Sequence, residues 1–467
     1  MLAVLTALYL ALSLWRHWHF GSAGFDLGIF DQAIWHYSRF EVPRGTIRDV
    51  PNLLGDHFHP ILMLLVPLYW IVPRVETLLV VQVLLIMGSL VPVYLFSLYR
   101  KHSQAVSLML ALSYALFWGL TLAINFDFHE IAFAIFALPL AIYLIELKKW
   151  RWFWPLIVVL LLTKESMGIV VACVGLYLLV RRYYVQGLIA FTAGVSWFAI
   201  VTKFIIPYFA GPGGGFGYWT YSKLGNTPLL AIKNLITKPL AMAKLLITPQ
   251  VKLDTLVSMF LPVLFLPIIS PIFIIGLPLI AERFWSDQSL YWQANFHYNG
   301  MIAPILALGV IDTLANFRNW IPNRKLGQAV VLVLTVLILT LNVSNLPKYP
   351  LWNLTNPTWW QLSANDKVGY KVLATIPATS SITTQNTVLP HLTQRLYAYL
   401  VNPDTSFKYS EYIVIDLQST ISPFDSPASM RSYVETKIAG HGYQLVVDEG
   451  GWLIWHNPAN AVGEPKA

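Results

Sequence analysis

The residues most capable of chemistry are concentrated near the start of the chain, in the polar stretch Gly24–Pro60, GFDLGIFDQAIWHYSRFEVPRGTIRDVPNLLGDHFHP. Its carboxylates and histidines are Asp26, Asp31, Glu41, Asp49, Asp56, His36, His57 and His59. A carboxylate can accept a proton from an attacking hydroxyl, and an imidazole can bind a metal or donate to a phosphate. The stretch therefore predicts a catalytic or ligand-binding loop.

Asp26 and Asp31 are the candidate catalytic residues of this loop. Asp26 opens a predicted short helix that ends near Ser38. There it could act as a general base or ligate a metal, or it could only cap the helix N-terminus. Five residues correspond to about 140° around a helix, so the two carboxylates need not meet the same ligand. Spacing alone leaves both interpretations of Asp26 open.

Asp56, His57 and His59 form a second group, in the sequence DHFH. In an extended backbone, His-x-His turns both rings to one face and could supply two ligands to a divalent metal such as Mg²⁺ or Mn²⁺. The same side chains could instead hydrogen-bond a phosphate. A purely structural role at a membrane interface fits so dense a group less well. No other cofactor is predicted.

Ionisable residues recur at later junctions between apolar segments, namely Asp127, His129, Glu130, Lys164, Glu165, Arg283 and His297. Such residues are costly at membrane depth, which makes them functional candidates. Alternatively, Lys164 and Glu165 could pair to close a turn, and Arg283 and His297 could belong to an interfacial belt. Lys164 and Arg283 are the cations best placed to neutralise a phosphate leaving group.

The elements that must position these groups are predicted to be membrane helices. Hydrophobic residues make up 56% of the chain and charged residues 12%, against about 25% charged in ordinary soluble domains. Apolar runs of about 20 residues recur as far as Asn345, beginning with Leu2–Trp18. We predict a polytopic α-helical membrane protein with about eleven crossings.

The net charge of +8 comes mainly from short turns between these segments. No nucleic-acid-binding motif accompanies it, so we expect no nucleic-acid partner. The basic turns after Tyr99, Leu147 and Val180 fall on one side, which the positive-inside bias assigns to the cytoplasm. The loop at 20–60, Asn125–Glu130 and Thr163–Ser166 then all face outward. A single cysteine excludes an intrachain disulfide framework.

Residues 1–349 are predicted to form the membrane domain. Within it, the short apolar segment 61–73 lies flat on the membrane, because 10–14 apolar residues are too few to span. Residues 207–254 form a long outer loop whose glycines, GPGGGFG, favour mobility. The proline-rich Thr255–Ile280 is interpreted as two short or broken crossings.

Residues 350–467 have the composition of a soluble α/β domain, which we place on the extracytoplasmic side, over the polar loops. Trp359–Ile376 has helical spacing, while Ser380–Thr384 and Tyr412–Leu417 are typical of buried strands. Tyr443–Asp448 and Trp452–His456 flank Glu449-Gly-Gly451, a hairpin pattern. These strands carry no catalytic motif.

The motifs FDLGIFDQAIW, GDHFHPIL at Gly55–Leu62 and TKES at Thr163–Ser166, with the stretch Gln293–Asn299, resemble a family of prokaryotic predicted membrane proteins of unknown function. That family carries FDxGxFDQ, HFxP and Lys-Glu-Asp-like motifs. The match covers nearly the whole chain. Ser166 departs from the pattern, since an Asp is often expected there.

The family is in turn similar in layout to the polyprenyl-phosphate-dependent glycosyltransferases of the GT-C superfamily, which include protein mannosyltransferase and lipid A aminoarabinose transferase relatives. In that superfamily an Asp-Glu pair follows the first membrane helix, and a juxtamembrane helix comes later. Asp26 matches the Asp of the pair, whereas Leu27 replaces the Glu, and Ile61–Val72 matches the juxtamembrane helix.

The resemblance implies a glycosyltransferase of the plasma (inner) membrane, with its N-terminus cytoplasmic. It would transfer a sugar from a polyprenyl-phosphate donor to a glycan, lipid or protein acceptor. Asp26, with Asp31 in support, would serve as the base. Asp56, His57, His59, His129, Glu130 and Glu165 would line the site, and Lys164 and Arg283 would hold the phosphate. A flippase for a lipid-linked precursor and a non-catalytic membrane scaffold are the alternatives.

Overall fold

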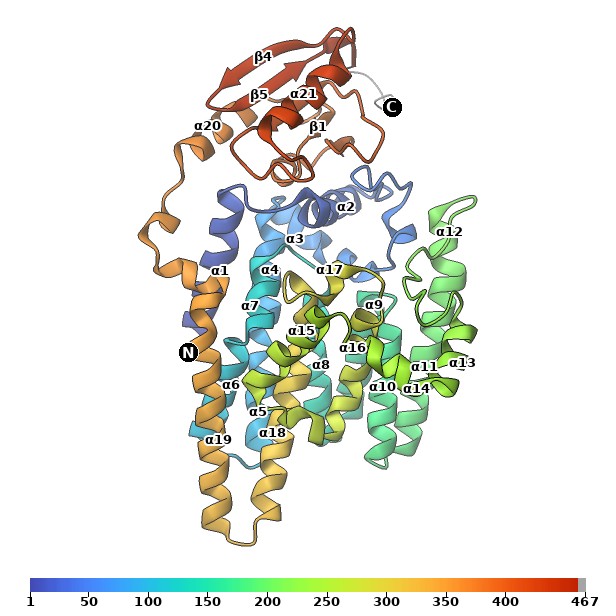
Figure 1. Ribbon diagram of the computed structural model, residues 1–467, viewed down its shortest axis with the longest axis vertical. Helices are drawn as coiled ribbons and strands as arrows, with labels where there is room; N and C mark the ends of the chain where they lie inside the picture. Colours follow the sequence, from blue (N-terminus) through green and yellow to red (C-terminus); the bar gives the residue numbers. More distant parts are fainter. Residues whose placement is uncertain (461–467) are drawn as a thin grey trace.

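The computed structural model describes residues 1–460 and shows a long helical bundle with a small α/β domain on one end (Figure 1). The first helix, α1 (Leu2–Trp18), has the predicted bounds and leads up to this domain. A π-helical turn at Gly24–Gly28 follows and continues into α2 (Ile29–Ser38), which ends where the sequence predicted. The polar loop thus lies between bundle and domain.

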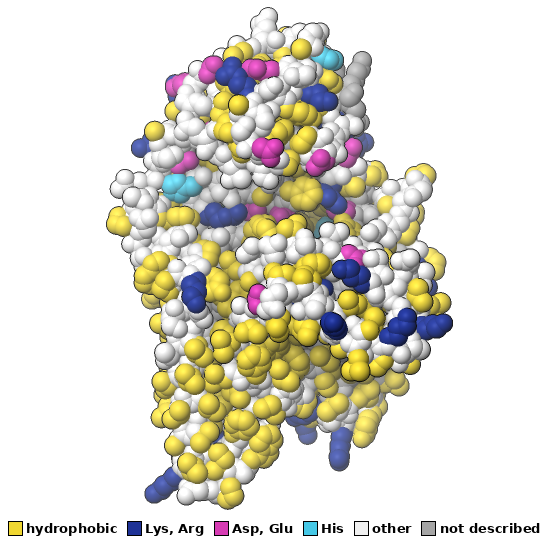
Figure 2. All heavy atoms as spheres, viewed as in Figure 1, with side chains coloured by type: hydrophobic (Ala, Val, Ile, Leu, Met, Phe, Trp, Pro, Cys, Tyr) yellow, Lys and Arg dark blue, Asp and Glu magenta, His cyan; other side chains and the backbone are white. Residues whose placement is uncertain are grey.

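Among residues 1–460, four helices are long and apolar enough to cross a membrane: Glu76–Tyr99, Tyr184–Ala210, His297–Trp320 and Arg324–Lys348. The pair α6 (Gln104–Ala115) and α7 (Trp118–Asn125) passes the same test together but bends by 45°. The lower part of the surface in Figure 2 is covered by hydrophobic side chains, as expected for contact with lipid. These features describe a multi-pass membrane protein, while the number of crossings remains a prediction.

Shorter apolar helices complete the bundle. They are α8 (Ile131–Glu146), α9 (Trp150–Thr163) and α10 (Met167–Val180), packed beside α4 (Glu76–Gly88), α5 (Leu90–Tyr99), α11 (Tyr184–Ile200), α18 (Ala303–Trp320) and α19 (Arg324–Asn345). Their buried aliphatic and aromatic side chains form one large core. Segment 61–73 is also helical, as a 3₁₀ helix at Pro60–Leu65 followed by α3 (Val66–Ile71).

The prediction of a long loop at 207–254 is wrong, because much of this segment is helical. It contains α12 (Ile206–Ala210), α13 (Pro228–Thr237), α14 (Pro239–Leu245) and α15 (Gln250–Phe260). Prolines at the first helical position need no N–H partner, and Thr227 caps α13 by accepting a hydrogen bond from the Leu230 N–H. The glycine-rich stretch before α13 has no helix or strand.

The predicted broken crossings at Thr255–Ile280 consist of the end of α15, three 3₁₀ helices and the start of α16 (Leu277–Phe284). The chain reverses at Leu264 and Phe265, which both adopt left-handed backbone angles. Two further pieces, α17 (Ser289–Trp292) and a 3₁₀ turn at His297–Asn299, lead into α18. This irregular region lies against α10 and α18 and supplies one wall of the site described below.

The C-terminal domain contains a sheet of order β2-β1-β3-β5-β4. Strands β1 (Ile382–Thr384), β2 (Ala398–Leu400) and β3 (Tyr412–Asp416) are parallel, and β4 (Gln444–Glu449) and β5 (Trp452–His456) form the predicted antiparallel hairpin. Helices α20 (Ala364–Leu373) and α21 (Pro427–Ile438) accompany the sheet. The helix predicted from Trp359 starts later because Ser363 and Asp366 form a capping box.

The domain is fastened to the polar loop by backbone and side-chain contacts. The Gly24 N–H donates to the Asn386 carbonyl at 2.7 Å, and the Phe25 N–H to Asn386 Oδ1 at 2.9 Å. One apolar core of the domain also includes Phe20 and Ile47 from the N-terminal region. The prediction that the domain packs over the polar loops is therefore confirmed.

Candidate functional site

Three polar segments that are distant in the sequence meet at the domain end of the bundle. His129 Nε2 lies 3.4 Å from Asp26 Oδ1, which joins the α7–α8 junction to the first loop. His57 Nδ1 lies 2.7 Å from Glu165 Oε1 at the α9–α10 junction, and Lys164 Nζ lies 3.7 Å from Glu130 Oε1. The sequence prediction that these segments face the same side is confirmed.

A cavity of about 250 Å³ opens among these segments and the irregular region before α18. Its polar lining includes His57, Lys164, Glu165, Glu282, Arg283 and His297. Ile131, Met167, Ile169, Val170, Leu279 and Met301 line it with apolar groups. Figure 2 shows charged side chains gathered in a hollow between the domain and the bundle. A ligand with both an anionic and an apolar part matches such a lining.

Asp26 lies beside this cavity, on the π-helical turn at Gly24–Gly28. It does not cap α2, because the turn runs directly into that helix and its side chain contacts His129 instead. Its side chain is 30% exposed. His129 stacks on His297, a cavity residue, with ring centroids 3.5 Å apart. Asp26 is thus connected to the cavity wall through two stacked imidazoles.

Lys164 and Glu165 do not pair with each other, as one sequence interpretation had it, but reach different neighbours. Burial alone would lower the pKa of Lys164, but the carboxylates of Glu130, Glu165 and Glu282 raise it above its ordinary value. Burial raises the pKa of Glu165, yet His57 and Lys164 outweigh this and lower it to about 2. The Lys164 ammonium is therefore charged and faces the cavity.

His57 and His59 make different contacts. His57 stacks on Tyr218 at 4.1 Å between ring centroids and pairs with Glu165, whereas His59 is buried against Phe30. Within residues 1–460, no group of three or more His, Cys, Asp or Glu side chains is arranged to hold a metal ion. The residues present do not fit the predicted Mg²⁺ or Mn²⁺ site, and no step below involves a metal.

Asp56 does not face a ligand; its carboxylate is held by protein groups. Arg48 donates to both of its oxygens at 3.0 Å, and the Tyr218 hydroxyl donates to Oδ1. Burial alone would raise the pKa of Asp56, but the hydrogen bonds from Arg48 and the charge of His57 hold it below its usual range. Asp56 therefore positions Tyr218, which lines the cavity.

Arg283 lines the cavity as predicted, but most of its N–H donors are taken up by the protein. Nε donates to the Tyr291 carbonyl at 3.0 Å, Nη1 to Asn299 Oδ1 at 2.6 Å and Nη2 to the Gln293 carbonyl at 3.1 Å. Burial lowers its pKa to about 10. The guanidinium thus organises the 291–299 segment, and its predicted role in holding a phosphate stays a prediction.

Asp31 lies apart from the cavity that Asp26 adjoins. It is fully buried and accepts hydrogen bonds from Tyr69 at 2.6 Å, Thr393 at 2.5 Å and Gln394 at 3.0 Å. Burial raises its pKa to about 6 against these hydrogen bonds. Asp31 lies about 140° around the helix from Asp26, so its side chain is turned toward the C-terminal domain. Asp31 joins α2, α3 and that domain.

Sequence reasoning did not select Tyr218, Glu282 or Tyr298 as site residues, although all three line the cavity, and it gave His297 an interfacial belt as the alternative role. His297 and Tyr298 fall in Gln293–Asn299, one of the stretches that carried the family resemblance. Tyr218 directly follows the glycine-rich sequence, and nothing in its own type distinguishes it from interfacial tyrosines. Only the tertiary fold brings it onto His57.

The model of a family described as "Predicted membrane protein (DUF2079)" matches residues 16–455, nearly the whole chain. The chain belongs to the DUF2079 family. No curated protein matches it. The motifs that the family resemblance rested on therefore lie where the structure gathers its polar side chains.

Two solved structures are similar in fold to this DUF2079 protein. ArnT from Cupriavidus metallidurans bound to undecaprenyl phosphate is similar, with a TM-score of 0.55 at 13% identity over 99% of this chain and 98% of that chain. The apo state of the same ArnT gives a TM-score of 0.52 at 11% identity, covering 98% of each chain. At such identities the likeness establishes an ArnT-like fold.

Proposed function

We propose that this DUF2079 protein is a membrane glycosyltransferase that uses a polyprenyl-phosphate-linked sugar as donor. The observation that carries the proposal is the cavity, in which the charged Lys164 and apolar side chains face one space next to Asp26. An anionic lipid phosphate needs a cation for its head and an apolar path for its chain. The fold supports this proposal, since ArnT is a GT-C glycosyltransferase and was solved with undecaprenyl phosphate.

In the proposed reaction the acceptor hydroxyl oxygen bonds to the anomeric carbon of the sugar. The bond from that carbon to the phosphate oxygen breaks, and its electron pair stays on the phosphate. Asp26 accepts the hydroxyl proton, and Lys164 stabilises the negative charge that develops on the leaving phosphate. A single displacement of this kind needs one base and no covalent intermediate. The acceptor is a glycan, lipid or protein hydroxyl on the extracytoplasmic side.

The test is transfer by the purified full chain in lipid nanodiscs, with a panel of radiolabelled polyprenyl-phosphate sugars. Wild type is compared with Asp26→Asn and with Asp49→Asn as a matched control, because Asp49 is in the same loop and 75% exposed. Transfer or slow donor hydrolysis that is lost only in Asp26→Asn supports the proposal. General-base catalysis contributes about 10²–10⁴-fold, which sets the expected loss.

Two other results point to the alternative functions. Undecaprenyl phosphate binding without transfer of any donor in the panel would favour a flippase for a lipid-linked precursor. A chain that neither binds the lipid phosphate nor transfers sugar would contradict the glycosyltransferase proposal and leave a membrane scaffold.

A further inference from the structure

The His129 ring is fixed by two aromatic neighbours and at one nitrogen. It stacks on His297, at 3.5 Å between ring centroids, and Phe126 lies beside this pair, 5.6 Å from each of the two rings. Its Nδ1 lies 2.9 Å from the Asp127 carbonyl oxygen. Because a carbonyl only accepts, Nδ1 carries a hydrogen, and Nε2 is the nitrogen left to face Asp26.

The backbone around His129 is fixed by buried groups of its own. Gln82 Oε1 accepts the His129 N–H at 2.8 Å, and Gln82 Nε2 donates to the Asp127 carbonyl at 3.0 Å. The Asp127 carboxylate accepts from Arg16 and from the Ala23 N–H, each at 2.9 Å. Ala23 directly precedes the turn that carries Asp26. Asp127 therefore holds both His129 and the segment of its partner.

The approach of Nε2 to Asp26 requires a proton between the two groups. A neutral Nε2 would point its lone pair at the carboxylate, which is repulsive, whereas an imidazolium donates to it. Burial alone would lower the pKa of His129, but Asp26 and Glu130 raise it above its ordinary value. The other ionisable groups around the pair include Asp127, Arg16, His297, Tyr298, His59, Lys164 and Arg283.

We propose that His129 is a positioning residue for Asp26, whose carboxylate it holds in place through a proton on Nε2. Among the described residues, His129 makes the only recorded ion-pair contact of the Asp26 carboxylate. The second carboxylate oxygen is thereby left for the acceptor hydroxyl. The catalytic part of this inference rests on the proposed glycosyltransferase function, while the protonated pair itself does not.

The activity test compares His129→Ala and His129→Gln with wild type. We expect His129→Ala to lower kcat about 10–100-fold with the donor KM changed less than about threefold. His129→Gln, which can donate a hydrogen bond but stays neutral, should restore part of kcat.

His102→Gln is the matched control, because His102 is a buried histidine that contacts a carbonyl at the far end of the bundle. It should leave kcat unchanged. A wild-type kcat in His129→Ala would overturn the inference.

A second measurement does not depend on activity. In full-length protein labelled with ¹⁵N-histidine in nanodiscs, the His129 signal is assigned as the one lost in His129→Gln. It should remain that of an imidazolium to higher pH in wild type than in Asp26→Asn. The same titration in both proteins would overturn the inference. If wild type transfers no sugar, the proposed function fails, and this titration still decides whether the pair exists.

Discussion

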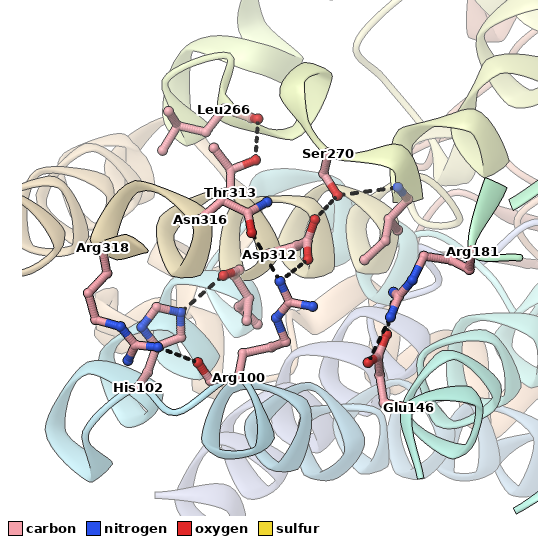
Figure 3. Close-up of polar contacts among 12 residues, drawn as sticks. Arg100, His102, Glu146, Arg181, Leu266, Ser270, Asp312, Thr313, Asn316 and Arg318 are labelled. Carbon is pink, nitrogen blue, oxygen red and sulfur yellow. Dashed lines mark hydrogen bonds and ion pairs between the residues drawn. The ribbon is translucent and has the colours of Figure 1, made fainter. Parts of the chain in front are cut away.

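Charged clusters occupy both ends of the helical bundle, and they differ in how completely they are paired. At the end away from the C-terminal domain, Arg100 Nη2 lies 2.5 Å from Asp312 Oδ1, and Ser270 donates to Asp312 Oδ2 at 2.7 Å (Figure 3). Nearby, Arg181 donates to both oxygens of Glu146 at 2.5 and 3.2 Å. These pairs connect helices, and their ionic groups satisfy one another.

At the cavity end, several buried polar atoms have no hydrogen-bond partner among the described residues. They are His59 Nδ1, Glu130 Oε2, His297 Nδ1 and Asn299 Nδ2. Each such atom costs about 1–3 kcal/mol, so a fold optimised only for stability would pair them. No atom of Arg100, Glu146, Arg181 or Asp312 is in this state within residues 1–460. Incomplete pairing is thus a feature of the cavity end that the ion pairs of Arg100 and Arg181 do not share.

The largest effect should come from breaking a satisfied pair. Asp312→Asn leaves Arg100 without its counter-charge, and loss of one partner of a buried ion pair costs about 3–5 kcal/mol of folding free energy. Equilibrium unfolding in detergent measures this loss, while transfer per folded molecule should be unchanged. Glu130→Gln, at the cavity end, is the matched variant and should cost much less stability. Equal losses in the two variants would contradict the comparison.

Acid should destabilise the cavity end through Glu165. Its pKa is lowered to about 2, below the ordinary 4.5, so its stabilising contribution is complete above about pH 4.5 and is lost as the pH falls toward 2. One pKa unit corresponds to about 1.4 kcal/mol, which gives at most about 3 kcal/mol. The unfolding free energies of wild type and Glu165→Gln, compared between pH 7 and 3, measure this loss of stability. If the unfolding free energy of Glu165→Gln fell with pH as steeply as that of wild type, Glu165 would not be the source of the acid sensitivity.

The charge of Lys164 should matter for lipid binding more than for stability. Lys164→Met is expected to weaken undecaprenyl phosphate binding about 30-fold, equivalent to about 2 kcal/mol, because Arg283, which also lines the cavity, already donates most of its N–H groups to the protein. Lys164→Arg, which keeps the charge, should bind within about threefold of wild type. Binding isotherms in nanodiscs give both values. Arg283→Lys serves as a contrast, since we expect it to lower stability by disturbing the 291–299 segment.

Hydropathy and charge predicted much of this arrangement. The lengths of the apolar runs predicted α1 and α10 with their observed bounds. The alternation of basic turns predicted that three polar segments lie on one side. The period-2 pattern and the Gly-Gly turn predicted the β4–β5 hairpin, because both signals are local. The segment 207–254 was missed as helix because its glycines and prolines masked the short helices between them.

The site residues were predictable by type but not by role. Asp26, Asp31, Asp56 and Arg283 all carry charge in polar stretches, yet three of them are satisfied by protein groups. Those partners are carbonyls and side chains up to 363 residues away in the sequence, and no spacing rule reaches that far. What separates Asp26 from the others is that its carboxylate has one ion-pair contact among residues 1–460, with His129 at 3.4 Å, and this sparse pairing is visible only in the tertiary structure.

The smallest effect should come from Thr393→Val, which tests whether Asp31 belongs with the satisfied pairs although it shares a motif with Asp26. The substitution removes a hydroxyl that donates to Asp31 Oδ2 and keeps the side-chain shape. Losing one buried hydrogen bond should cost about 1–2 kcal/mol of unfolding free energy, because Tyr69 and Gln394 still donate to Asp31 Oδ1. Transfer per folded molecule should stay within about twofold of wild type, since Asp31 makes no contact with the cavity beside Asp26. A loss of transfer comparable to that of Asp26→Asn, with stability unchanged, would instead place Asp31 in the catalytic machinery and remove the distinction between paired and unpaired carboxylates.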